Sequence, residues 1–250
     1  MIINSKNLFK MLPDLVLIDT DNTMYDYAPC HKAGLNSMKV AMKKKLSLSD
    51  LQFEEIYIKS RKIIKKKLKG TASSHNRILY IQKMLELMGL GSQVFLAVEY
   101  EQIYWRSFLS KAVLFDNLTD FLDDLRLYNI PSVIVTDLTA KIQFRKIIYF
   151  QLDKYFDNIV TSEEAGFDKP HKSPFLLAIE KSKPKGNNIW MIGDNPINDI
   201  EGAKKAINAI TLQKKHKGVL LGKGKYRPDL IFDRFLDLRK LLKSLQKNND

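Results

Sequence analysis

The chain has 250 residues, of which 45% are hydrophobic and 28% charged, a composition typical of a folded globular protein rather than a disordered one. No apolar run approaches the ~18 residues of a membrane-spanning helix, and the first 15 residues lack the apolar core and cleavage site of a signal peptide. A single cysteine, Cys30, excludes an intramolecular disulfide, so we expect a cytoplasmic protein.

The net charge of +13 has two interpretations. Lysine and arginine gather in four runs, at residues 43–45, 59–69, 214–217 and 223–227. Such runs are used by nucleic-acid-binding surfaces, but these are scattered, and one carries Ile63, Ile64 and Leu68 at helical spacing. We therefore interpret them as exposed helix faces that also attract small anions, and we expect neither a nucleic-acid nor a membrane partner.

The first strong element is the apolar run Leu-Val-Leu-Ile at residues 15–18, which predicts a buried parallel strand. It ends in the polar sequence Asp-Thr-Asp-Asn-Thr. Because residues two apart in an extended chain share a face, Asp19 and Asp21 can point into one crevice at the carboxyl edge of a sheet. Two neighbouring carboxylates repel when ionised, so such a site brings in a cation or keeps one acid protonated.

Residues 25–111 have helical character and almost no strand signal. We expect four amphipathic helices, over residues 31–46, 49–68, 73–89 and 93–109. Ser49 or Asp50 is the expected N-cap of the second helix, and Ser73 or Ser74 that of the third. Four helices inserted after one strand predict a separate cap.

From about residue 112 helices and strands alternate. Helices are expected over residues 116–129, 141–152, 173–182 and 200–207, and strands over 131–137, 157–162, 187–195 and 208–213. Residues 229–233 read as an edge strand before a lysine-rich terminal helix. The alternation predicts an α/β fold with a parallel sheet, helices on both faces and right-handed crossovers. We expect a Rossmann-like three-layer core of residues 1–24 and 112–250, with a helical cap of residues 25–111.

Later strand ends carry further polar residues of matching kinds: Thr136 and Asp137 after one strand, Lys169 ahead of a helix, and Asp194 and Asp199 around the loop that opens another helix. In a parallel sheet all of these junctions lie at the same edge as Asp19. Each residue alone has a structural alternative: Thr136 can cap the following helix, and Asp199 can be the N-cap of the helix at 200–207. Asn208 is expected to take the left-handed conformation after that helix.

Together these motifs resemble the haloacid dehalogenase superfamily, specifically its phosphatases with a helical cap inserted after the first strand. Residues 19–23 match the first motif, Thr136 the second, Lys169 the third and residues 193–199 the fourth. The resemblance implies the following roles: Asp19 as nucleophile, Asp21 as acid/base, Thr136 with Asp137 beside it and Lys169 as phosphate-binding residues, and Asp194 with Asp199 at a Mg²⁺ site. Dehalogenases of the family usually lack the second acid, so Asp21 favours phosphoryl transfer.

The chemistry can also be argued from the residues. A carboxylate such as Asp19 can attack phosphorus, and Asp21 can protonate the leaving oxygen and then deprotonate water. Mg²⁺ uses one or two carboxylates with phosphate oxygens and waters, which fits Asp19, the Asp21 carbonyl and Asp194 as ligands. Asp199 then orients a water or Lys169 from outside the coordination sphere.

We therefore expect Mg²⁺-dependent hydrolysis of a small phosphomonoester, a sugar phosphate or nucleoside monophosphate, by a monomer or homodimer. Two alternatives stay open: a phosphomutase of the same family, and a non-catalytic anion- or nucleic-acid-binding protein on this scaffold. In the cap, His75, Asn76 and Arg77 are the candidates that read the leaving group. Their structural alternative is a solvated helix start.

Overall fold

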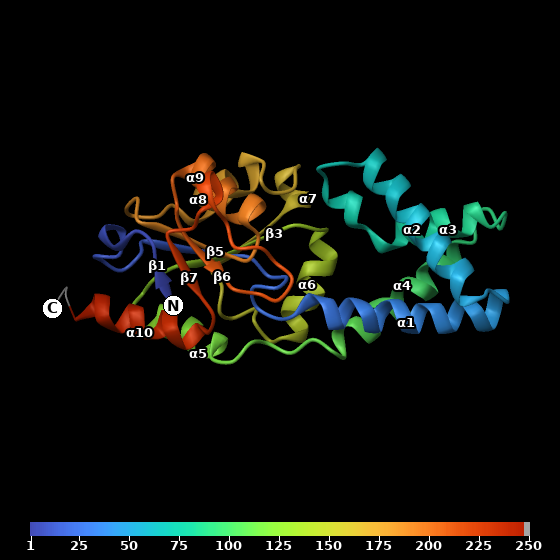
Figure 1. Cartoon of the computed structure of the whole chain (residues 1–250), viewed down its shortest axis with the longest axis horizontal. Helices are drawn as coiled ribbons and strands as arrows, with labels where there is room; N and C mark the ends of the chain where they lie inside the picture. The colour runs from blue at the N-terminus through green and yellow to red at the C-terminus, as the bar shows by residue number, and fades with distance from the viewer. Residues whose placement is uncertain (248–250) are drawn as a thin grey trace. The chain divides into compact units, whose positions relative to one another are not determined.

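The structure, a computed structural model, describes residues 1–247 and divides into two compact units. The core unit comprises Met1–Asp26 and the chain from Leu114 onward, and the helical unit is Tyr27–Val113 (Figure 1). Among the described residues, no helix is long and apolar enough to span a bilayer.

The core unit is built on a seven-stranded sheet in the order β1-β7-β6-β5-β2-β3-β4. Its strands are β1 (Ile2–Ile3), β2 (Leu15–Ile18), β3 (Ser132–Thr136), β4 (Asn158–Thr161), β5 (Ile189–Gly193), β6 (Ile210–Lys214) and β7 (Leu230–Phe232). All neighbours pair in parallel except β1 and β7, so the predicted parallel α/β sheet is confirmed. The strand predicted over residues 229–233 is confirmed as β7, but its predicted place at the edge of the sheet is wrong, because β1 pairs antiparallel with β7 and takes the edge.

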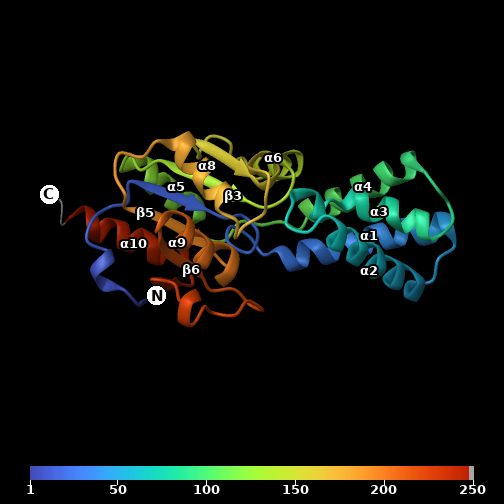
Figure 2. The same cartoon turned by 90° about the horizontal axis from the view of Figure 1, so that it is seen from above.

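Helices cover both faces of this sheet, which confirms the three-layer architecture (Figures 1 and 2). The α-helices of the core unit are α5 (Leu118–Leu127), α6 (Ala140–Tyr149), α7 (Ser162–Ala165), α8 (Lys172–Ser182), α9 (Gly202–Ile207) and α10 (Phe235–Gln246). On one face, Leu17 of β2 and Met191 of β5 belong to a buried cluster with Phe175 and Ala178 of α8. The α5 and α10 helices pack together on the opposite face.

The segment between β5 and β6 differs from the single helix expected over residues 200–207. A π-helical turn, η3 (Pro196–Glu201), precedes α9. The Asn195 side chain caps this turn by accepting from the amides of Ile197 and Asn198. The alternative that Asp199 is an N-cap is therefore wrong. Asn208 adopts the predicted left-handed conformation, with φ of 51°.

The helical unit contains the four expected helices: α1 (Tyr27–Leu46), α2 (Asp50–Lys67), α3 (Arg77–Leu87) and α4 (Val94–Leu109). Ser49 caps α2 and forms a capping box with Gln52, as one of the two predicted caps. The cap predicted for the third helix is wrong. Residues 72–75 form a short 3-10 helix, and the Asn76 side chain instead accepts from the Ile78 amide to start α3.

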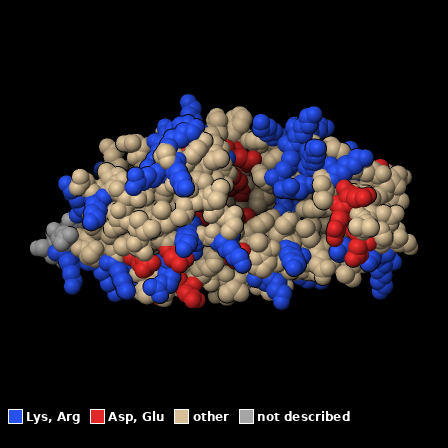
Figure 3. Space-filling view, in the orientation of Figure 1, with Lys and Arg blue, Asp and Glu red and all other residues tan. Residues whose placement is uncertain are grey.

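Two of the four basic runs, residues 43–45 in α1 and most of residues 59–69 in α2, lie on exposed helix faces, as interpreted. The interpretation is wrong for the other two, because residues 214–217 begin with a buried Lys214 at the end of β6 and residues 223–227 include only a short 3-10 helix. In α2, Lys59, Lys62 and Lys66 are exposed while Ile64 is buried. Figure 3 shows Lys and Arg side chains gathered over α2. This arrangement is that of an amphipathic helix whose charged side faces solvent.

The two chain passages that connect the units run beside each other within the core unit. Tyr25 forms an isolated antiparallel bridge with Leu114, and the Phe115 amide donates to the Met24 carbonyl over 2.8 Å. The inserted residues therefore leave the core and return to it at one place.

Candidate active site

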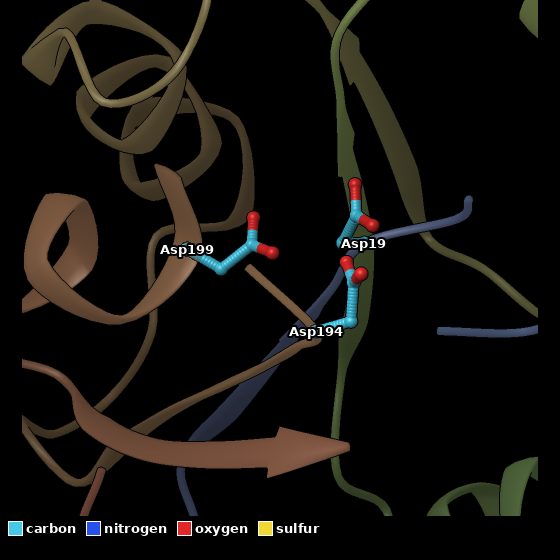
Figure 4. A group of neighbouring side chains, drawn as sticks. All are labelled: Asp19, Asp194 and Asp199. Atoms are coloured by element: carbon cyan, nitrogen blue, oxygen red, sulfur yellow. The ribbon is translucent and has the colours of Figure 1, made fainter. Parts of the chain in front are cut away.

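Three buried carboxylates converge at the carboxyl edge of the sheet (Figure 4). Asp19 follows β2, Asp194 follows the adjacent β5, and Asp199 lies in η3. One oxygen of each lies within 4.8 Å of the others. The neighbouring strands fix this placement, because the Asp19 amide continues the ladder by donating to the Ile192 carbonyl over 2.9 Å. The sequence predicted that these three acids share one edge, and the structure brings them together.

Lys169 bridges this acidic group from the loop before α8. Its Nζ donates to Oδ1 of Asp19 and to Oδ1 of Asp199, each over 2.7 Å, and to the Val135 carbonyl over 2.8 Å. Burial alone lowers the pKa of Lys169, but the Asp19 and Asp199 carboxylates raise it above its usual range, so the ammonium stays charged. A lysine with a side chain only 2% exposed is tolerated because its charge is paired.

The acids remain crowded despite this lysine. Burial raises the pKa of Asp19 to about 7, partly offset by Lys169 and reinforced by Asp199. Burial, with Asp199 and Asp19 adding to it, raises the pKa of Asp194 to about 8. Three ionised carboxylates and one ammonium leave two negative charges uncompensated, so the group has the composition of a site for a hard divalent cation with oxygen ligands. The residues present therefore fit Mg²⁺.

Asp21, the second acid of the first motif, has other partners than these carboxylates. Its Oδ1 accepts from Lys146 Nζ over 2.7 Å and from the Tyr25 hydroxyl over 2.5 Å. Its side chain is 28% exposed, against 10% for that of Asp19. Of the two acids of the first motif, Asp21 is therefore more exposed to solvent than Asp19.

The second motif lies at the end of β3, next to β2. Thr136 shares a 2.7 Å hydrogen bond with the Thr20 hydroxyl and accepts from Gln143 Nε2 over 2.8 Å. The alternative that Thr136 caps the next helix is wrong, since α6 starts at Ala140 after Thr139. The carboxylate of Asp137, the other residue predicted at the phosphate site, accepts from the Lys169 amide over 2.8 Å. It therefore anchors the backbone that carries Lys169.

Sequence reasoning missed two residues of helix α6. Gln143 holds Thr136, and Lys146 holds Asp21. A signal for Lys146 was present, because it lies four residues after Ile142 and next to Ile147, on the buried face of the helix. A lysine on an apolar helix face needs a buried anionic partner, which the sequence alone did not identify.

The three candidates in the helical unit have partners within that unit. Asn76 caps α3, and the His75 carbonyl accepts from Arg77 over 2.6 Å. The Arg77 guanidinium also donates to the hydroxyls of Tyr27 and Tyr104. Arg77 is only 8% exposed, so its alternative as a solvated side chain is wrong. Within residues 1–247, the partners of this buried cation are hydroxyl and carbonyl groups and not a carboxylate.

Comparisons with known proteins identify the family and the fold of this chain. A family model described as haloacid dehalogenase-like hydrolase matches residues 13–206. The chain is 33% identical over 199 residues to the ribulose-1,5-bisphosphate 5-phosphatase of Halopiger xanaduensis, covering 79% of this chain and 82% of that protein. It is 25% identical over 244 residues to the glyceraldehyde 3-phosphate phosphatase of Methanopyrus kandleri, covering 93% and 98% of the two chains. The crystal structure of a 2-haloacid dehalogenase from Pseudomonas syringae has the same fold, with a TM-score of 0.76 at 20% identity over 93% of this chain and 99% of that one.

Proposed function

The chain belongs to the haloacid dehalogenase-like hydrolases, as its motifs predicted, and we propose that it is a Mg²⁺-dependent phosphatase of a small phosphomonoester. The observation that carries the proposal is the buried group in which Lys169 bridges Asp19 and Asp199, with Asp194 alongside. The phosphatase names of the relatives support the reaction class.

We assign the nucleophile to Asp19. One carboxylate oxygen attacks phosphorus, and the bond from phosphorus to the leaving oxygen breaks, which gives an aspartyl-phosphate. The Lys169 ammonium, 2.7 Å from Oδ1 of Asp19, lies where charge on the transferring group gathers. Thr23, which donates to Oδ2 of Asp19 over 3.2 Å, holds the carboxylate in place.

We assign acid and base catalysis to Asp21. In the first step its carboxyl group gives a proton to the leaving oxygen. In the second step its carboxylate takes a proton from the water that attacks phosphorus, and the bond to Asp19 breaks to release inorganic phosphate. The greater exposure of Asp21 supports this assignment, because an acid/base must reach both the leaving group and water.

Asp19 and Asp194 are the proposed carboxylate ligands of Mg²⁺, with the Asp21 carbonyl as a third ligand. When bound, the ion supplies positive charge that stabilises the transferring phosphoryl group. Asp199 is the proposed outer residue, because its Oδ1 accepts from Lys169 and its Oδ2 accepts from the Asn195 amide over 3.0 Å. Thr136 is retained as a proposed phosphate contact.

The proposed substrate is a sugar phosphate, with a nucleoside monophosphate as the second class. The relatives are named for ribulose-1,5-bisphosphate and glyceraldehyde 3-phosphate, which supports the first class. We propose that the helical unit acts as a cap that selects the leaving group. Arg77 is its candidate for reading an anionic leaving group, because its buried guanidinium has hydroxyl and carbonyl partners but no carboxylate among residues 1–247.

The test is a release assay for inorganic phosphate over a panel of phosphorylated metabolites with Mg²⁺. Asp19→Asn serves as the control, since it removes the attacking charge at almost constant volume. We expect turnover of at least one sugar phosphate by the wild type and none by the variant. A sugar phosphate isomerised without phosphate release would contradict the proposal and favour a mutase.

A further inference from the structure

We infer that Lys146, which lies outside the four motifs, is a positioning residue that orients Asp21 for proton transfer. The inference rests on the proposed phosphatase function and names a residue of the core unit that the motifs do not include. Lys146 is inferred to set the orientation of the Asp21 carboxylate, and not to change the affinity of the protein for its substrate.

The geometry around Asp21 carries the inference. Lys146 Nζ and the Tyr25 hydroxyl both donate to Oδ1 of Asp21, over 2.7 and 2.5 Å. Lys146 Nζ also lies 5.8 Å from the centroid of the Tyr25 ring. The two donors are themselves rigid, because the Lys146 side chain is 2% exposed and Tyr25 is fully buried against Phe150. Two fixed donors on one oxygen restrict the rotamer of the carboxylate.

A purely structural role explains this arrangement poorly. Ion pairs that are fully buried commonly stabilise a protein no better than apolar residues of the same volume. Here a buried cation holds a carboxylate that is 28% exposed, so one end of the pair is fixed in the core and the other reaches solvent. This difference in exposure suits Asp21, because a proton-transfer group must be both accessible and held in one orientation.

The neighbouring turn of α6 supports the same reading. Gln143 Nε2 donates to the Thr136 hydroxyl over 2.8 Å and to the Asp137 carbonyl over 2.6 Å. Gln143 and Lys146 lie three residues apart, so one face of α6 orients a side chain of the first motif and one of the second. We infer that this face is a support for the catalytic edge of the sheet.

Orientation of Asp21 matters where a proton moves. An alkyl leaving group needs a proton as its bond to phosphorus breaks, whereas p-nitrophenolate is a stable anion and leaves without one. Loss of Lys146 should therefore slow phosphorylation of Asp19 by an alkyl ester but not by an aryl ester. Water attack on the aspartyl-phosphate should slow in both cases, because that step always needs the base.

The test is rapid-quench measurement of Asp19 phosphorylation in the full-length protein with Mg²⁺. Lys146→Met is compared with Lys141→Met, an exposed lysine of the same helix, using glycerol 3-phosphate and p-nitrophenyl phosphate. For Lys146→Met we expect phosphorylation by the alkyl ester to fall about 10- to 100-fold and by the aryl ester to stay within about twofold. The dissociation constant of each ester should be unchanged. With the aryl ester phosphoenzyme should accumulate and KM should fall, because dephosphorylation then limits turnover.

Equal losses with the two esters would assign Lys146 a merely structural role and overturn the inference, as would wild-type rates with both. Tyr25→Phe removes the other donor to Oδ1 of Asp21. It should slow the same steps as Lys146→Met, but by a smaller factor. It decides the question if Lys146→Met does not fold. Absence of phosphoenzyme in the wild type with either ester would instead overturn the proposed function, and this inference with it.

Discussion

The sharpest test of the site geometry is Gly193→Ala, at the end of β5. A Cβ at this position would lie 2.4 Å from Cγ and Oδ2 of Asp199 and 2.5 Å from its Cβ. Asp199 cannot yield easily, because it is 1% exposed and bound by Lys169 Nζ and by the Asn195 amide. The methyl group must therefore displace the carboxylate, and with it Lys169.

The size of the effect follows from this overlap. Ordinary contact begins near 3.4 Å, so the added atom intrudes by about 1 Å. Overpacking of this kind costs about 1–3 kcal/mol of unfolding free energy. For a chain of 250 residues this corresponds to a Tm lower by about 2–12 °C. Misplacing Lys169 by about 1 Å should reduce kcat/KM by about 100-fold.

The assay combines thermal unfolding with kcat/KM on the best substrate of the panel. Gly70→Ala is the control, because Gly70 has φ of +79° in the helical unit and its added Cβ meets nothing within 4 Å. It should lose about 1 kcal/mol of stability and keep full activity. In an Asp199→Gly background, which removes the Asp199 Cβ as well as the carboxylate, Gly193→Ala should cost much less stability. Wild-type kcat/KM in Gly193→Ala, or an equal cost in both backgrounds, would refute the reasoning.

Three further predictions concern charge. Asp19→Asn should abolish turnover and keep a cooperative unfolding transition; measurable turnover by the purified variant would contradict its role as nucleophile. Without metal, the raised pKa values of Asp19 (about 7) and Asp194 (about 8) mean that their contribution to stability is present below about pH 4 and is lost as pH rises through 7 to 8. Mg²⁺ should therefore raise Tm more at pH 8.5 than at pH 5.5 and EDTA should reverse the shift, whereas equal shifts would argue against these ligands. Arg77→Met should raise KM about 10-fold or more for a bisphosphate, because a charge-assisted hydrogen bond is lost, but should change KM little for p-nitrophenyl phosphate. An equal rise in KM for both substrates would contradict the proposed role of Arg77.

The convergence of Asp19 and Asp194 could be predicted because the carboxyl ends of parallel strands meet at one edge of a sheet. An apolar run followed by a polar turn marks each such end. Asn208 could be predicted on a different ground, because its side chain tolerates the left-handed conformation that follows the helix. These features depend on local sequence and on the direction of the strands, which the alternating pattern fixes.

Other features depend on strand order, which the pattern does not give. Lys146 reaches Asp21 because β3 lies beside β2, so the helix after β3 stands next to the first motif. The two-residue strand β1 is too short to show a period, and so the edge of the sheet was assigned to β7. Before α3, the sequence Ser-Ser-His-Asn offers several capping side chains, and tertiary packing selected the last of them.

The bridge between Tyr25 and Leu114 has an evolutionary consequence. Since both ends of the insert meet at one point, the 87 residues of Tyr27–Val113 are topologically a single surface loop of the sheet domain. The entropy of closing a loop grows only slowly with its length, so inserts of very different size are compatible with the same sheet. A lineage can therefore exchange the inserted helical unit while inheriting the sheet domain and its buried carboxylates.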